Sequence, residues 1–139
     1  MSLSIRNQLP GTVTSVTPGE AMATVKVRLD AGQEITAAVT LEAVQELGLV
    51  SGSTVRALVK STEVSLATGP VNGLSIRNQL PGTVTDVTTG GAMARVKVQV
   101  EGAELTSAIT KDAVTELGLS AGSEVVALIK STEVSLSNA

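Results

Sequence analysis

The chain has 139 residues, a formal net charge of −3 and a composition of 42% hydrophobic and 17% charged residues, which is too apolar for a disordered protein. It contains no Cys and no His, which excludes disulfides, thiolate zinc sites, thiol nucleophiles and the Ser-His-Asp triad. The absence of aromatic residues and the acidic balance argue against nucleic acid as a partner. No stretch reaches the roughly 20 apolar residues of a membrane span, and we expect a cytoplasmic protein without membrane partners.

The sequence consists of two copies of one unit. Residues 3–14 return unchanged as residues 74–85, and residues 60–66 return as residues 130–136. The segment between the copies contains Gly, Pro and small polar residues, which is typical of a linker. The predicted boundaries are a first domain at 1–67, a linker at 68–73 and a second domain at 74–139.

In chain order, each unit predicts three strands, a short helix and two more strands. In the first unit the apolar patterns predict strands at 4–17, 21–29, 33–39, 54–60 and 62–66. The helix is expected over Leu41 to Leu47, with Thr40 as N-cap and Gly48 as its end. Turns are expected at Pro10-Gly11 and Gly90-Gly91. The predicted fold is mainly β, with two tandem OB-like five-stranded β-barrels that each carry one short α-helix.

The small size of each unit predicts association between chains. A unit of about 65 residues, with a core of Val, Leu, Ile and Ala alone, is close to the lower limit for one self-sufficient core. Met22 and Met93 share one position in the two copies, and we interpret them as core or interface residues rather than ligands. The chain is therefore expected to form a homo-oligomer.

The carboxylates show no spacing that would give an acid–base pair or a cation cage, which disfavours catalysis. The hydroxyls and cations that recur in both copies are more informative. Ser4 and Arg6 alternate on an extended segment, Lys60-Ser61 lies between two predicted strands, and Thr40 lies at a helix N-terminus. Donors and cations without acids suit a small tetrahedral oxyanion. The same residues also suit an ordinary surface with a capped helix, and the residue types leave both interpretations open.

A family resemblance adds to this pattern. Residues 4–11, Ser-Ile-Arg-Asn-Gln-Leu-Pro-Gly, resemble the Ser-Ala-Arg-Asn-Gln-x-x-Gly opening of the Mop domain. The likeness continues through residues 35–40 and 43–49, and residues 57–61 are similar to the family ending A-x-[IV]-K-[AS]. The second copy repeats the pattern, so the chain resembles the molbindins, stand-alone proteins with two tandem Mop domains. Ile5 and Ile76 depart from the Ala that is usual in the family.

The resemblance implies a ligand and the residues that hold it. The ligand would be molybdate, with tungstate as a second oxyanion and no organic cofactor, and the role would be storage, buffering and homeostasis of molybdenum. The assembly implied is a homotrimer with sites at domain or subunit interfaces, where the threonines complete the pocket. The implied site residues are Ser4, Arg6, Thr40, Lys60 and Ser61 in the first copy and Ser75, Arg77, Thr110, Lys130 and Ser131 in the second.

Three points stay open at this stage. Arg6 and Arg77 can serve through the guanidinium or through the backbone N–H. The family also has a second kind of site near symmetry axes, whose residues the sequence does not place. The alternative function is a molybdate-responsive interaction or sensing module that acts on a partner protein. An enzyme of molybdenum cofactor chemistry is disfavoured by the missing His, Cys and paired acids.

Overall fold

The structure is a computed structural model that describes residues 2–139, and within them the chain is mainly β. The two repeats contain the same elements in the same order. The first repeat contains β1 (Asn7–Pro18), β2 (Met22–Leu29), β3 (Glu34–Thr40), α1 (Leu41–Leu47), β4 (Thr54–Val59), the 3-10 turn η1 (Ser61–Glu63) and β5 (Ser65–Ala67). The second contains β6 (Asn78–Thr89), β7 (Met93–Val100), β8 (Ala103–Thr110), α2 (Lys111–Leu117), β9 (Glu124–Ile129), η2 (Ser131–Glu133) and β10 (Ser135–Asn138).

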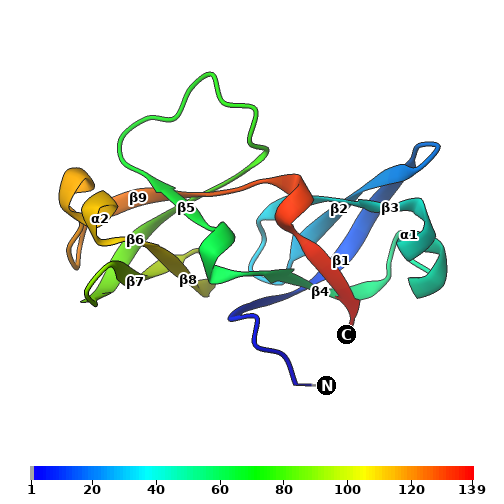
Figure 1. Cartoon of the computed structure of the whole chain (residues 1–139). Coiled ribbons are helices and arrows are strands. Elements are labelled where there is room, and N and C mark those ends of the chain that lie inside the picture. The colour runs from blue at the N-terminus through cyan, green and yellow to red at the C-terminus, as the bar shows by residue number, and fades with distance from the viewer. Residues whose placement is uncertain (1) are drawn as a thin grey trace.

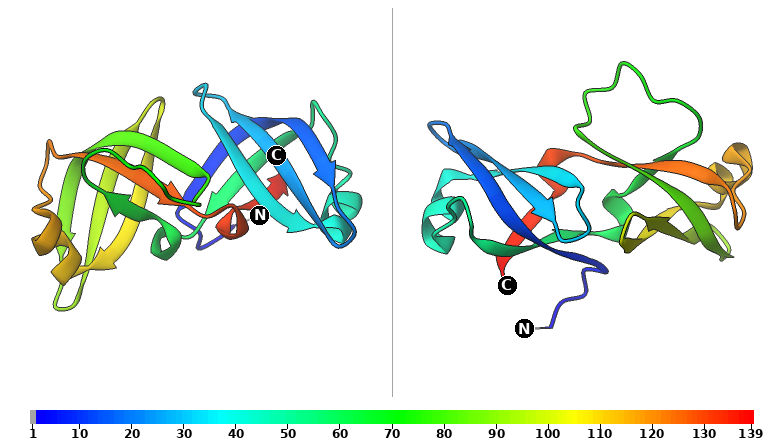
Figure 2. Two further views of the ribbon diagram at one scale, coloured as in Figure 1. Left: turned by 90° about the horizontal axis from the view of Figure 1, so that it is seen from above. Right: turned by 180° about the vertical axis from the view of Figure 1, so that it is seen from behind.

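The strands form two five-stranded sheets that curl into half-barrels lying side by side (Figures 1 and 2). All neighbouring strands pair antiparallel, in the orders β10-β4-β1-β2-β3 and β5-β9-β6-β7-β8. These sheets and their helices confirm the predicted fold class.

The last strand of each repeat is exchanged. β5 ends the first repeat but pairs with β9 of the second, where Leu66 lies opposite Ala127. β10 ends the chain and pairs with β4 of the first repeat, where Leu136 lies opposite Ala57. The sequence boundaries at 1–67 and 74–139 therefore describe the repeats, whereas each half-barrel takes one strand from the other repeat.

The apolar patterns place the core as predicted. In β2 the alternate residues Ala23, Val25, Val27 and Leu29 are at most 3% exposed, because successive side chains of a strand point to opposite faces. Equivalent residues of the second repeat join them in one hydrophobic cluster that spans both half-barrels. Aliphatic packing across the two repeats thus replaces the larger area that aromatic residues would bury.

The predicted helix forms at Leu41–Leu47. The Thr40 hydroxyl accepts a hydrogen bond from the Ala43 N–H at 3.1 Å, and Gly48 ends the helix with φ 63°. That left-handed conformation favours glycine. The predicted strand at 62–66 is wrong in its first half, because Ser61–Glu63 turn as a 3-10 helix before the exchanged strand begins.

The predicted turn at Pro10-Gly11 is also wrong. β1 continues through both residues, and Gly11 has a neighbour on each side, Val55 of β4 and Leu29 of β2. A Cβ atom at Gly11 would lie 2.7 Å from the Arg28 carbonyl oxygen, so glycine here permits a close approach of two backbones within the curled sheet. The turn at Gly90-Gly91 is confirmed between β6 and β7, where the Gly90 N–H donates to the Met93 carbonyl at 2.8 Å.

We predict that Gly11→Ala lowers the free energy of unfolding by about 1–3 kcal/mol, because the added methyl group forces β1 and β2 apart. Gly91→Ala is the matched control, since a Cβ there meets nothing within 4 Å, and it should stay within about 0.5 kcal/mol of the parent chain. Denaturant unfolding at one fixed protein concentration measures both. Equal stability of the two variants would contradict the close-approach role of Gly11.

Candidate functional site

In each repeat the segment before the first strand meets the 3-10 turn after the fourth strand, and a pocket lies between them. The first pocket has a volume of about 210 Å³ and the second about 260 Å³. The first is lined by Ser4, Ile5, Arg6, Lys60, Ser61 and Thr62. The second is lined by Ser75, Ile76, Arg77, Lys130, Ser131 and Thr132. The structure therefore brings together the predicted serines, arginines and lysines of each copy.

The serines of the two 3-10 turns indicate that the pockets bind a ligand. The Ser61 and Ser131 Oγ atoms are buried and have no hydrogen-bond partner within residues 2–139. A buried hydroxyl without a partner costs about 1–3 kcal/mol, so such groups are normally satisfied. An acceptor atom in the pocket would satisfy each of them.

The charges of the pockets suit an anion. Neither lining contains a carboxylate, and the two ion pairs within residues 2–139, Arg95–Asp86 and Lys97–Glu104, do not involve the pocket cations. The Lys60 and Lys130 side chains are exposed at the pockets, without a carboxylate partner. Each pocket thus offers positive charge that the protein itself does not neutralise.

The two arginines hold the shape of the pocket wall. The Arg6 Nε donates to the Ser4 carbonyl at 3.0 Å and its Nη2 donates to the Leu3 carbonyl at 3.3 Å. Arg77 makes the same two hydrogen bonds, at 3.0 and 3.1 Å, to Ser75 and Leu74. The guanidinium groups therefore hold the preceding segment in a bend, and the backbone N–H groups of that segment lie in the same wall.

The 3-10 turn adds backbone donors. The Glu63 N–H donates to the Lys60 carbonyl at 2.9 Å, which is the first hydrogen bond of η1. The N–H groups of Ser61 and Thr62 precede that bond, and the first N–H groups of a helical turn have no partner inside the turn. The predicted junction between two strands at Lys60-Ser61 is thus the start of a 3-10 turn, and Lys60, Ser61 and Thr62 line the pocket.

Asn7 and Asn78 support the pockets from behind, a role that sequence reasoning missed. The Asn7 side chain donates to the Thr106 carbonyl and accepts from the Thr106 N–H, both at 2.8 Å. Asn78 makes the same pair with Thr36. Both amides are at most 3% exposed, and each joins the residue after the pocket arginine to the edge strand of the other repeat. The sequence feature that could have indicated this role is the Asn that follows the pocket Arg in both copies.

The structure does not place Thr40 or Thr110 in either pocket of the same chain. Both are exposed, and their hydroxyls cap α1 and α2. Met22 and Met93 lie opposite them in the strand register and are each 47% exposed, so the methionines are not core residues. The completion of the pockets by the threonines across an interface stays a prediction.

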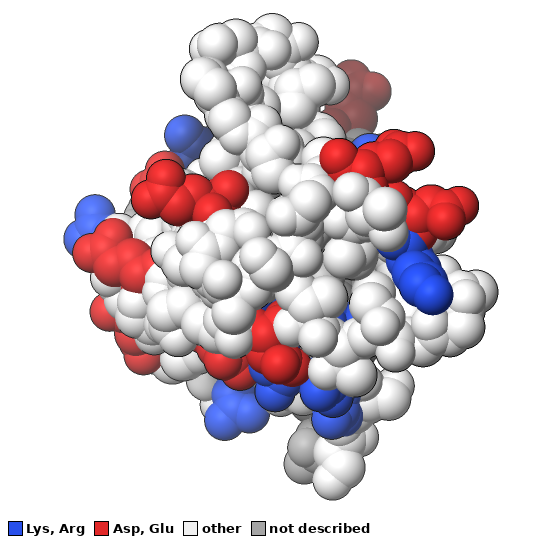
Figure 3. All heavy atoms as spheres, turned by 90° about the vertical axis from the view of Figure 1, so that its left-hand side faces the viewer, with Lys and Arg blue, Asp and Glu red and all other residues white. Residues whose placement is uncertain are grey.

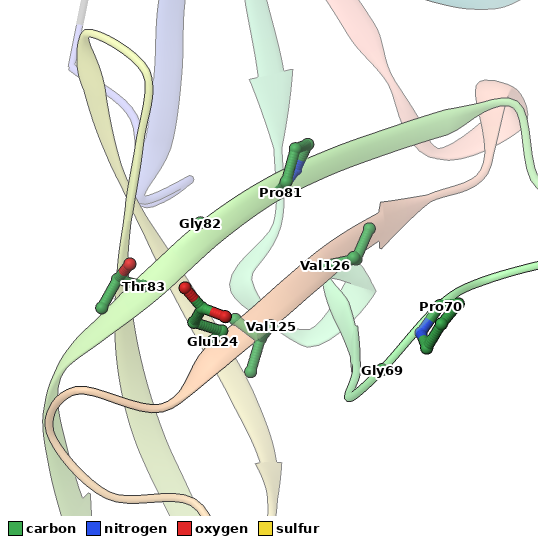
Figure 4. Close-up of a pocket in the computed structure, with 8 residues that line it drawn as sticks. All are labelled: Gly69, Pro70, Pro81, Gly82, Thr83, Glu124, Val125 and Val126. Carbon is green, nitrogen blue, oxygen red and sulfur yellow. The ribbon is translucent and has the colours of Figure 1, made fainter.

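A larger cavity of about 510 Å³ lies elsewhere, between the loop after β5 and strands β6 and β9 (Figure 4). Pro70 faces it from the loop, Pro81 from β6 and Val126 from β9. Its only charged lining residue is Glu124, so it lacks the cations that an anion would need.

Metal-ligand clusters and membrane-spanning helices are both absent from the described residues. Residues 2–139 contain no group of three or more carboxylates placed to hold a metal ion. None of the helices in that part of the chain has the length and apolar character needed to cross a membrane. Figure 3 shows acidic and basic side chains interspersed over the second half-barrel. The loop between β5 and β6 projects at the top of Figure 3, and its residues 68–76 include no charged side chain.

We predict that Asn7→Ala lowers the free energy of unfolding by about 1–3 kcal/mol, because it leaves the Thr106 N–H and carbonyl without partners. Gln79→Ala removes an exposed amide that bonds to the Ile76 carbonyl, and its effect should remain within about 0.5 kcal/mol. Chemical unfolding monitored by circular dichroism compares the two. A loss at Gln79 as large as at Asn7 would argue against the buried clamp.

Comparisons with known proteins agree with this geometry. The TOBE domain family matches residues 3–66 and 74–136. The chain is 39% identical over 137 residues to the molybdenum transport protein ModE of Azotobacter vinelandii, covering 98% of this chain and 51% of that protein. It is 38% identical over 135 residues to the molybdenum-pterin-binding protein MopB of Rhodobacter capsulatus, covering 96% and 50%. The chain thus spans about half the length of the curated relatives it matches.

A solved structure matches along the whole chain. The crystal structure of the cytoplasmic molybdate-binding protein ModG, in a form with molybdate bound, superposes with a TM-score of 0.97 at 40% identity and covers 100% of both chains. The repeat, the tandem half-barrels and the two family matches lead to one conclusion: this chain belongs to the TOBE domain family and carries two tandem copies of that domain.

Proposed function

We propose that the chain binds molybdate, and tungstate by the same chemistry, in the two pockets formed by the N-terminal segment and the 3-10 turn of each repeat. The observation that carries the proposal is the buried, unpartnered serine hydroxyl beside an unpaired lysine, in a lining without carboxylates, present twice. The likeness to ModG, a protein described with molybdate bound, supports this choice of ligand.

The donor set fits a tetrahedral dianion. Molybdate has two negative charges and only acceptor oxygens, so a pocket for it needs donors and no acceptors. Lys60 and Ser61 would donate from the turn and Ser4 from the opposite wall, at the roughly 2.7–3.0 Å typical of such hydrogen bonds. The Arg6 guanidinium is engaged with backbone carbonyls, and it would therefore contribute mainly charge and shape.

We also propose a role in storage, buffering and homeostasis of molybdenum in the cytoplasm, without catalysis. The sequence contains no His or Cys, and the lining residues that the structure describes include no carboxylate that could activate a nucleophile or accept a proton. The matched ModG is described as a cytoplasmic molybdate-binding protein, which supports both the compartment and a binding role.

The assembly belongs to the same proposal. We propose a homotrimer in which Thr40 and Thr110 complete the pockets of neighbouring subunits. Exposed Met22 and Met93 lie beside these threonines in the strand register and supply apolar area for a contact. Because the threonine hydroxyls already accept a hydrogen bond from the backbone, their O–H groups stay available as donors.

Equilibrium dialysis against molybdate, tungstate, sulfate and phosphate, with elemental analysis of the retained protein, tests the ligand. Lys60→Glu should weaken molybdate binding at the first pocket by at least about tenfold, because a charge-assisted hydrogen bond of about 1.5–3 kcal/mol is lost and a repelling anion is added. Lys130→Glu should do the same at the second pocket. The double variant should lose most of the bound molybdate.

Lys26→Glu is the matched control, since it makes the same charge change at an exposed lysine of β2 that lines neither pocket. It should retain the parent stoichiometry and affinity. Circular dichroism verifies that each variant is folded. A folded double variant that binds molybdate as the parent does would place the site elsewhere.

The oligomer has its own test. Sedimentation equilibrium at micromolar concentration should give about three times the 14.0 kDa mass of one chain. Met22→Glu combined with Met93→Glu should shift the mass toward the monomer, because charges would enter an apolar contact. A stable 14.0 kDa parent species would refute the trimer.

A further inference from the structure

The two pockets have the same side chains but different supports. Position by position, both linings read Ser, Ile, Arg, Lys, Ser and Thr. Behind them, β8 packs against η1 of the first pocket, and β3 packs against η2 of the second. The two pockets therefore differ in the strand that supports each turn.

At one of the positions where these strands differ, a side chain forms a hydrogen bond to the turn. The Ser107 hydroxyl on β8 donates a hydrogen bond to the Val64 carbonyl at 2.7 Å, and Ser107 is completely buried. The equivalent residue on β3 is Ala37, which is equally buried and has no hydroxyl to donate. The first turn thus has a buried side-chain hydrogen bond that the second cannot form.

That hydrogen bond acts on the residue that closes the turn. The Val64 N–H donates to the Ser61 carbonyl at 3.4 Å, and the Val134 N–H donates to the Ser131 carbonyl at the same distance. Both closing bonds are long and weak. In the first repeat the Ser107 hydroxyl holds Val64 in addition, so the turn that presents the Ser61 hydroxyl is held at its end.

We propose that Ser107 is a positioning residue for the first pocket, and that it makes this pocket bind oxyanion more tightly than the second. The inference rests on the proposed function. A donor held in its bound geometry loses less conformational freedom when the ligand binds. The difference in affinity between the two pockets should be about two- to tenfold, which corresponds to the free energy of one neutral hydrogen bond.

Titration calorimetry with molybdate tests this in two backgrounds that isolate one pocket each. In Lys130→Glu, where the first pocket remains, Ser107→Ala should weaken binding by about two- to tenfold. In Lys60→Glu, where the second pocket remains, Ala37→Ser should strengthen binding by a similar factor, because it supplies the missing hydroxyl. Ser107→Ala in this second background should leave the affinity as it was. A merely structural effect of Ser107 would weaken both pockets together, and that result would overturn the proposal.

Hydrogen exchange on the unaltered chain gives a second measurement that needs no variant. The amides of residues 61–64 should exchange more slowly than those of residues 131–134, because the first turn opens less often. Equal exchange in the two turns would overturn the positioning role.

Failure of the proposed function and failure of the positioning role give different results. A chain that retains no molybdate in dialysis refutes the proposed function. A chain that binds it in two equal pockets refutes only the role of Ser107.

Discussion

The exchange of the last strand between the repeats is the constraint on which the rest of the structure depends. A repeat of about 65 residues with an aliphatic core is close to the lower size limit for a stable unit. By giving β5 to the second sheet and β10 to the first, the chain completes both sheets and joins their cores in one cluster. Each half-barrel thus depends on the other repeat for an edge strand.

The pocket is a direct consequence of this exchange. The chain must leave β4 and cross to the other sheet, and it does so through the 3-10 turn at Ser61–Glu63. Within residues 2–139 this turn leaves a buried serine hydroxyl without a hydrogen-bond partner. The strand of the other repeat packs behind this turn, so the energy of core packing holds the donors in place. A polar site that would cost stability in isolation is supported by the contact that stabilises the whole molecule.

Some residues of the site form hydrogen bonds within the protein, and others keep donors that a ligand can use. The chain is acidic overall, yet each pocket lining consists of cations, hydroxyls and one isoleucine, without a carboxylate. The arginines and the buried Asn7 and Asn78 satisfy their own hydrogen bonds within the protein and fix the wall. The lysines and turn serines remain free for a ligand. Such a preformed set of donors suits reversible binding of an oxyanion, because little has to rearrange when the ion enters.

The sequence by itself determined the local structure and the composition of the site. Alternation fixed the buried face of β2, and Thr40 and Gly48 fixed both ends of α1, because strand period and helix caps depend on neighbouring residues alone. The repeated Ser, Arg, Lys and Ser, together with the family resemblance, identified four of the six residues that line each pocket.

Only the tertiary structure decided which repeat completes which sheet. Residues 60–66 and 130–136 are identical, so their sequence does not determine which sheet each strand joins. Pro10-Gly11 has the sequence of a turn, yet it lies within β1 because β2 approaches its backbone closely. The hydrogen bond from Ser107 to Val64 joins residues from different repeats, so no local pattern could have shown it. Contacts between distant segments are set by packing, and packing exists only once the chain has folded.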